Sequence, residues 1–280
     1  MRRTRSAPAE PGRPAGAPLL SAAARPRATV IVAACAGVTA LLGAWLGRGT
    51  HTDPVDTAVD SRVQASLAGH LKLLEVLAWL GDLPAVTGIT AILVATCLLR
   101  RRYRGAALLA LSVPAAAIIT ERLLKPLVDR TLRGFLSFPS GHATVTFALA
   151  TAAAVLLAGA LGVSRAVRLA VAATAFAAAA AVAAAMIALR LHYFTDAVAG
   201  AAVGTGTVLA VALALDLAVQ AWGQRARAQA NEDSLVHDVN LPNQLGVFPV
   251  GLGEPCSVGG RCRACPVMPL CAWARRRRRQ

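Results

Sequence analysis

Two long apolar runs follow each other in the chain, ATVTFALATAAAVLLAGALGV at residues 143–163 and RLAVAATAFAAAAAVAAAMIAL at residues 168–189. Each has about 20 residues, the length that an α-helix needs to cross the roughly 30 Å hydrocarbon core of a bilayer. Only four residues separate them. The two runs therefore predict a pair of transmembrane helices, one entering the membrane and one returning.

The composition of the whole chain agrees with this prediction. Of 280 residues, 56% are apolar and 15% are charged, whereas an ordinary soluble domain has about 45–50% apolar and about 25% charged residues. The net charge of +15 comes from arginines in short clusters between apolar runs. A nucleic-acid-binding domain would carry them along a polar face with aromatic residues between them. The composition thus indicates a polytopic membrane protein and disfavours a nucleic-acid partner.

Further apolar runs complete the predicted membrane domain. They lie at residues 28–47, 83–99, 106–120 and 197–222. Residues 54–80 are amphipathic, with charges on one face, and predict a single interfacial helix. The last run contains Gly200, Gly204 and Gly206, and such small residues let transmembrane helices approach closely. We therefore expect an all-α integral membrane fold of six transmembrane helices and one interfacial amphipathic helix, with disordered termini.

The basic residues predict the orientation of these helices. With both termini in the cytoplasm, 21 of the 29 basic residues fall on inner segments and 29 − 21 = 8 on outer ones. Cytoplasmic loops of membrane proteins carry such an excess of arginine and lysine. We therefore expect residues 121–142 and 190–196 on the outer face of the plasma membrane.

The segments outside the apolar runs differ in character. Residues 1–26 are rich in arginine, proline and alanine, which predicts a disordered basic tail. Residues 27–222 form the expected membrane domain, and residues 223–280 a cytoplasmic tail. That tail carries Cys256, Cys262, Cys265 and Cys271, for which a metal site, an unstructured segment and oxidised disulfides all stay open. Its final arginine run either binds anionic inner-leaflet lipid or is simply solvated.

Ionisable residues at membrane depth are costly and point to function, and two outer segments collect them. The first contains Lys125, Arg130, Arg133 and the block Pro139-Ser140-Gly141-His142, and the second contains Arg190, His192 and Asp196. Fifty residues separate the two histidines, which fits one span in and one span back. Both histidines are therefore expected on the same membrane face.

These residue types suit chemistry on a phosphoryl group. His192 and Asp196 are four apart, so on a helix the carboxylate can accept from one ring nitrogen and orient the other toward a substrate. Lysine and arginine side chains bind phosphate through charged hydrogen bonds. Ser140 and Gly141 open a helix, whose N-terminus favours anions. His142 can give a proton to a leaving oxygen.

The combination resembles the three-part signature of the type 2 phosphatidic acid phosphatase superfamily, the membrane lipid phosphate phosphatases, over about residues 50–222. The resemblance implies that His192 is the nucleophile, through a phosphohistidine, and that Asp196 supports it. It implies that His142 protonates the leaving group and that Lys125, Ser140 and Gly141 hold phosphate. It implies no metal and no other cofactor.

Two parts of the signature differ in this chain. Leu132-Arg133 stands where the family has Arg-Pro, and Ala185-Met186 stands where the family has Ser-Arg. Two phosphate-binding arginines are therefore absent from their usual places. We expect Arg130 or Arg133 to replace the first and Arg190 to replace the second.

Three hypotheses of function follow. The first is a membrane hydrolase that removes phosphate from a lipid phosphate or isoprenoid (pyro)phosphate at the outer face. The second is a catalytically weak or inactive relative that binds lipid phosphate. The third, a small transporter, is disfavoured because no internal inverted repeat is visible. Each residue alone also has a structural explanation: Ser140 as a helix cap, His192 as an interfacial side chain, Lys125 and Arg190 as side chains that reach toward headgroups.

Overall fold

The structure is a computed structural model that describes residues 18–47, 53–160 and 162–244, with side chains as far as residue 231. The chain divides into two units, residues 1–226 and 227–280, and the first is described here. Of the second, the backbone of residues 227–244 is helical. The four tail cysteines, the final arginines and residues 1–17 of the expected N-terminal tail lie outside the described residues.

Five helices in the described part of the chain are long and apolar enough to cross a membrane. They are α1 (Arg25–Leu46), the continuous helix Tyr103–Val128, α7 (Gly141–Ala158), α8 (Arg165–Ala188) and the first part of α9 (Phe194–Gln244). The bent pair α3 (Leu71–Leu80) and α4 (Leu83–Leu99) makes a sixth if it counts as one span. The expected all-α membrane fold is confirmed, with five to six spans.

The amphipathic segment 54–80 differs from the prediction of a single interfacial helix. It forms two helices, α2 (Pro54–Leu67) and α3, separated at residues 68–70. Gly69 lies in this break, and glycine is among the weakest helix formers because its backbone has the most freedom to lose. Helix α3 then continues into α4 with a bend of 52° at Gly81-Asp82. The second half of the segment thus forms a helix of its own, which leads directly into α4.

The third span changes its winding along its length. Helix α5 (Tyr103–Ile118) continues into η1 (Ile119–Leu124), a π-helix, and into the short α6 (Lys125–Val128). Pro114 lies inside α5, where it cannot donate a backbone hydrogen bond. A π-helical segment is often found at a functional site. Here it carries Glu121 and leads directly to Lys125.

A two-stranded hairpin follows this span. Strands β1 (Thr131–Leu132) and β2 (Phe135–Leu136) pair antiparallel. The two residues between them, Arg133 and Gly134, have φ angles of 53° and 83°. Positive φ values at both central positions are typical of a type I′ hairpin turn.

Close approach of α7 and α9 depends on glycine. A Cβ added at Gly200 would lie 2.5 Å from the carbonyl oxygen of Ser140, and one added at Gly204 would clash with the carbonyl oxygen of Thr144. The small residues of the last span therefore pack against a neighbouring helix, as the sequence predicted. Around this contact lies an apolar core that includes Leu108, Leu109, Ala148, Ala152, Val208 and Ala212.

One buried carboxylate ties the N-terminal segment to α9. Asp216 accepts hydrogen bonds at 2.9 Å from the backbone N–H groups of Leu19 and Leu20, and its Oδ1 lies 2.7 Å from Arg104 of α5. Residues 18–26, which the sequence assigned to the N-terminal tail, thus have a defined place, and α1 begins at Arg25.

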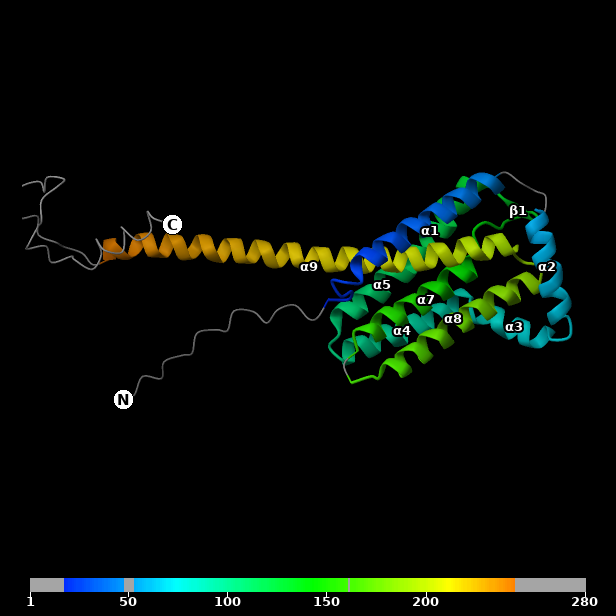
Figure 1. The fold of residues 1–280 in the computed structure, drawn as a ribbon, viewed down its shortest axis with the longest axis horizontal. Helices are drawn as coiled ribbons and strands as arrows, with labels where there is room; N and C mark the ends of the chain where they lie inside the picture. The colour runs from blue at the N-terminus through cyan, green and yellow to red at the C-terminus, as the bar shows by residue number, and fades with distance from the viewer. Residues whose placement is uncertain (1–17, 48–52, 161, 245–280) are drawn as a thin grey trace, which may run out of the picture. The chain divides into compact units, whose positions relative to one another are not determined.

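The end of the bundle opposite Asp216 carries additional short elements. Helices α2 and α3 and the hairpin gather there, beside the first turns of α7 and α9 (Figure 1). Helix α3 packs against α8, whose last turn leads to His192. All the residues that the sequence singled out on outer segments lie at this end.

Candidate active site

Two histidines face each other at the ends of neighbouring helices. His142 lies in the first turn of α7, and His192 lies in the turn between α8 and α9. Their ring centroids are 6.5 Å apart and the rings are inclined by 57°. The expectation that both histidines lie on one face therefore agrees with the structure, which brings the rings close enough to flank one small group.

The start of α7 fixes the position of His142. The helix begins after the cap residue Ser140, whose Oγ accepts a hydrogen bond from the N–H of Ala143 at 3.4 Å. The backbone N–H of Ser140 in turn donates to the carbonyl oxygen of Asp196 at 2.9 Å. Ser140 is fully buried. The Pro-Ser-Gly-His block is thus a helix cap that also connects the two histidine-bearing segments.

Asp196 lies on the same side of the α9 terminus as His192. Its Oδ2 is 3.6 Å from Nδ1 of His192, which is an ion-pair distance but too long for a hydrogen bond. Within the described residues, the buried Nδ1 has no hydrogen-bond partner. The same Oδ2 accepts from the backbone N–H of Tyr193 at 3.1 Å. Nδ1 is therefore the ring nitrogen that faces the carboxylate, and Nε2 is the other one.

Arg130 holds the other oxygen of this carboxylate. Its guanidinium donates to Oδ1 of Asp196 and to Oδ2 of Asp56, both at 2.7 Å, and to Thr195 Oγ1 at 2.8 Å. It also lies over the ring of Tyr193, 4.2 Å from the centroid. The side chain is 1% exposed. This geometry favours a positioning role for Arg130 over the phosphate contact expected from the sequence.

Helix α2 supplies two carboxylates that sequence reasoning missed. Asp56 Oδ1 accepts from the N–H of Thr195 at 2.8 Å, and Asp60 Oδ1 accepts from the N–H of Phe194 at 3.0 Å. The unpaired N–H groups at a helix start favour such acceptors. Burial and the charge of Asp56 raise the pKa of Asp60 to about 6. The spacing of Asp56 and Asp60, four residues apart on an amphipathic helix, was the available signal.

Lys125 lies beside the α7 terminus but has a partner. Its Nζ is 2.8 Å from Oε1 of Glu121, one turn earlier. The same oxygen lies where a side chain on Gly141 would be, because a Cβ added there would be 2.7 Å from it. Lys125, Glu121 and Gly141 therefore form one group, in which a carboxylate occupies the space next to the expected phosphate-binding backbone.

The remaining arginines lie apart from this group. Arg133 in the hairpin turn and Arg190 after α8 are exposed, and both have positive φ angles, 53° and 60°. Neither makes a hydrogen bond or ion pair with the described residues. Met186 is 3% exposed, and its carbonyl oxygen accepts from the N–H groups of Leu191 and His192 at 2.9 and 3.3 Å. The structure therefore gives Arg133 and Arg190 no contact at the histidines.

A further carboxylate meets His142. Oδ1 of Asp82, at the bend between α3 and α4, is 3.0 Å from Nε2 of His142. A Cβ added at the preceding Gly81 would lie 2.6 Å from Cδ2 of the same ring. Sequence reasoning missed Asp82, since an aspartate before a proline-containing helix start reads as an ordinary cap.

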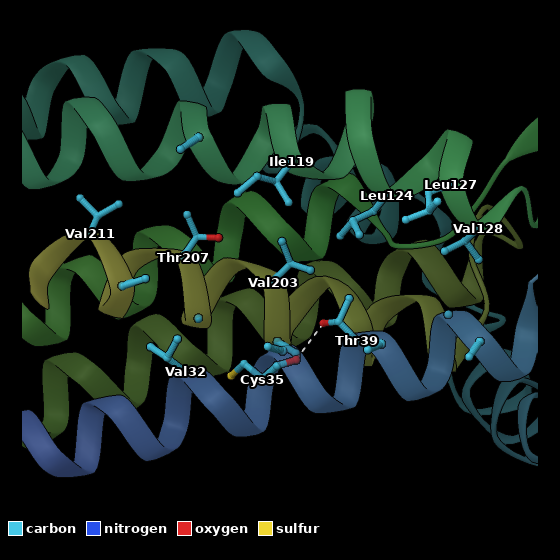
Figure 2. A pocket seen from close by; sticks show the side chains of 18 of the residues that line it. Val32, Cys35, Thr39, Ile119, Leu124, Leu127, Val128, Val203, Thr207 and Val211 are labelled. Atoms are coloured by element: carbon cyan, nitrogen blue, oxygen red, sulfur yellow. Dashed lines mark hydrogen bonds between the residues drawn. The ribbon is translucent and has the colours of Figure 1, made fainter. Parts of the chain in front are cut away.

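A large apolar cavity of about 1020 Å³ lies between α1, the third span and α9. Figure 2 shows Val32, Cys35 and Thr39 of α1 on one side, Ile119, Leu124 and Leu127 on the other, and Val203, Thr207 and Val211 of α9 between them. Leu124 and Leu127 are on the same short helical stretch as Lys125. Two of the lining residues are therefore within two positions of Lys125, which the sequence assigned to phosphate binding.

Comparison with known proteins agrees with this arrangement. The sequence model of the PAP2 superfamily matches residues 122–219, which contain both histidines, Asp196 and Lys125. The fold is similar to a crystal structure described as the first transmembrane PAP2 type phosphatidylglycerolphosphate phosphatase from Bacillus subtilis, with a TM-score of 0.52 and 19% sequence identity. That match covers 69% of this chain and 96% of the other. No curated protein sequence matches significantly.

The described part of the chain thus has an all-helical membrane fold, and residues 122–219, which carry the site, are similar to the PAP2 superfamily. The resemblance to the PAP2 superfamily, which the two histidine motifs indicated, is confirmed by the family match and the shared fold.

Proposed function

We propose that the protein is a membrane phosphatase that hydrolyses a lipid phosphate or isoprenoid (pyro)phosphate through a phosphohistidine on His192. The observation that carries the proposal is the pair of imidazoles 6.5 Å apart, each with a carboxylate near one ring nitrogen. A phosphoryl group between the rings has a nucleophile on one side and a proton donor on the other. Lys125 and the N-terminus of α7 offer positive charge to its oxygens.

Each residue has a definite role in this reaction. Nε2 of His192 attacks phosphorus as the bond to the leaving oxygen breaks, and His142 gives that oxygen a proton. Asp196 stabilises the positive charge that develops on His192. Water then attacks the phosphohistidine, and His142 takes the proton of that water, which restores both histidines. Arg130 fixes Asp196 from the opposite oxygen.

The apolar cavity favours a lipid substrate over a soluble one. It is lined mostly by aliphatic residues of the membrane-spanning helices, which suit contact with a hydrocarbon chain. A lipid whose phosphate reaches Lys125 can place a chain along α1 and α9. A soluble phosphate ester would make no use of this cavity.

The test is release of inorganic phosphate by the purified protein in detergent from phosphatidic acid, phosphatidylglycerol phosphate and a polyprenyl pyrophosphate. We expect release with and without a chelator, and a labelled phosphoryl group on His192 after rapid quenching at neutral to basic pH. His192→Ala abolishes release, whereas His70→Ala, an exposed histidine, does not. Full activity in His192→Ala contradicts the proposal.

One observation favours a second candidate, a weak or inactive relative that binds lipid phosphate. Arg130 is committed to two carboxylates, and Lys125 is paired with Glu121. The site therefore presents less unpaired positive charge than the motif comparison led us to expect. Saturable binding of phosphatidic acid by a protein that releases no phosphate supports this candidate.

We also propose that both termini are cytoplasmic and that the site opens on the outer face of the plasma membrane. The split of basic residues supports this orientation. Phe135 is 78% exposed in β2, so Phe135→Cys in a cysteine-free chain gives a reporter. Labelling only from the cytoplasmic side contradicts the orientation. We further expect truncation after residue 226, the boundary of the first unit, to leave activity in place.

A further inference from the structure

His142 has a carboxylate of its own, and this contact has no evident structural purpose. Nε2 of His142 lies 3.0 Å from Oδ1 of Asp82. The Asp82 side chain is 48% exposed, and ion pairs at such exposure add little to stability. The pair therefore contributes little to holding α4 and α7 together.

Asp82 does not cap the helix that follows it. It is the cap residue of α4, with the extended backbone of a helix cap, but its side chain makes no capping hydrogen bond. Asp53, the cap residue of α2, does accept from the N–H of Val55 at 2.8 Å. A capping bond is worth about 1 kcal/mol. At Asp82 the carboxylate is turned to the histidine instead.

The backbone at the bend makes this approach possible. A Cβ at position 81 would lie 2.6 Å from Cδ2 and 3.1 Å from Cβ of His142, and 3.1 Å from Val182 of α8. Only glycine leaves room for the ring against the chain there. The Cδ2–Nε2 edge of His142 is thus held by Gly81 and Asp82, and Nδ1 is the nitrogen without a partner among the described residues.

We propose that Asp82 is a positioning residue that orients His142 and stabilises its protonated form, with Nε2–H donated to Asp82 and Nδ1–H given to the leaving oxygen. This inference rests on the proposed function. The charged and titratable groups around His142 are Asp82, His192 and Lys125, and Asp82 is the only carboxylate among them. The site then contains two His–Asp pairs, one for the nucleophile and one for the acid.

The proton transfers balance through both steps. When Nε2 of His192 bonds to phosphorus, the leaving oxygen takes the Nδ1 proton of His142, and His142 becomes neutral. When water attacks the phosphohistidine, Nδ1 of His142 accepts a proton from that water. Asp82 keeps its hydrogen bond to Nε2 throughout, and no co-reactant other than water is required.

Asp82→Asn tests the proposal, because asparagine keeps the shape and the preference for helix caps but loses the charge. General acids contribute about 10²- to 10⁴-fold, so we expect kcat/KM on a short-chain phosphatidic acid, which reports the steps up to departure of the leaving group, to fall about 10-fold. On p-nitrophenyl phosphate, whose leaving group needs no proton, kcat/KM changes by less than about twofold. Asp53→Asn, the matched control, affects neither substrate selectively. Equal losses on both substrates, or no loss on phosphatidic acid, overturn the proposal.

A double-mutant cycle shows whether Asp82 acts through His142. In a His142→Ala background, Asp82→Asn should have less than about a twofold further effect. The same 10-fold loss in that background overturns the proposal. If wild-type protein releases no phosphate from either substrate, the proposed function fails instead.

A measurement on the unsubstituted protein makes the inference independent of activity. The chain has five histidines, so ¹⁵N-histidine labelling gives few signals, and His142→Ala assigns the relevant pair. We expect Nε2 of His142 to carry a proton near neutral pH. A neutral ring with its proton on Nδ1 and a bare Nε2 overturns the proposal, since Asp82 then has nothing to accept.

Discussion

The guanidinium of Arg130 donates to Oδ1 of Asp196 at 2.7 Å, while Oδ2 of the same carboxylate lies 3.6 Å from Nδ1 of His192. One carboxylate thus connects an arginine to the proposed nucleophile. Because Asp56 holds the guanidinium from its other side, the orientation of Asp196 depends on α2, which lies far from it in sequence. Helix α2 therefore supports the site.

Arg130→Ala is predicted to destabilise the protein as well as inactivate it. The substitution leaves two buried carboxylates, on Asp56 and Asp196, without a cation. Breaking a buried pair in this way costs roughly 3–5 kcal/mol. Thermal unfolding in detergent measures the loss, and the exposed Arg133→Ala is the control, with an effect within about 0.5 kcal/mol. An unchanged midpoint with lost activity would mean that Arg130 contacts phosphate, as its sequence position first indicated.

Glu121→Gln is predicted to strengthen phosphate binding. The carboxylate of Glu121 lies next to Gly141 and pairs with Lys125 at 2.8 Å, so it repels an incoming phosphate and competes for the lysine. Removing one like charge at about 4 Å is worth about 1 kcal/mol in water, or about fivefold. The inhibition constant for inorganic phosphate should fall by that factor. Glu75→Gln, on exposed α3 surface, is the control, and an equal fall there contradicts the specific role of Glu121.

The sequence predicted the helical membrane fold and the meeting of the histidines because both follow from local patterns. Uncharged runs of about 20 residues set the spans, and the 50-residue interval from His142 to His192 sets their common face. The expectation of one continuous helix over residues 54–80 was wrong, since the segment forms two helices, α2 and α3. The helix boundary at Gly69 depends on how α3 packs against α8. The local sequence pattern contains no information about this packing.

Local sequence patterns could not predict the carboxylates that support the site, because these carboxylates contact residues far away in the sequence. Asp56 reaches Thr195 across 139 residues, and Asp82 reaches His142 across 60. In sequence, each reads as a charge on a helix surface or a cap. Arg130 was placed in the right segment, but its burial depends on carboxylates from α2 and α9 that only the tertiary fold brings together.

Asp60→Asn is predicted to change how stability depends on pH. The pKa of Asp60 is raised from 3.8 to about 6 by burial and by Asp56, so the folded state holds more protons than the unfolded state between these values. Stability from this proton is fully present below pH 3.8 and is lost as pH rises through about 6. Asparagine keeps the acceptor for the N–H of Phe194 without the charge. The variant should therefore gain in thermal midpoint over the wild type as pH rises from 4 to 7.

Asp60→Ala separates charge from hydrogen bonding in the same experiment. It removes the carboxyl group and the acceptor for Phe194, so its midpoint should lie below that of Asp60→Asn at every pH. A wild-type-minus-Asn difference that stays constant from pH 4 to 7 contradicts the raised pKa.

Filling the apolar cavity is predicted to weaken the binding of long-chain substrates alone. Ala40 lines the cavity from α1, whereas Val38, two residues earlier, is 38% exposed and does not line it. Ala40→Phe places a ring in the space assigned to the hydrocarbon chain. We expect KM for a long-chain phosphatidic acid to rise about tenfold, equivalent to about 1.4 kcal/mol, with kcat/KM for p-nitrophenyl phosphate unchanged because the histidines are untouched. Val38→Phe adds the same ring on the same helix and should leave both substrates unaffected. If Ala40→Phe leaves long-chain kinetics unchanged, the lipid chain lies along another face of the bundle, and the cavity between α1 and α9 is no part of the substrate site.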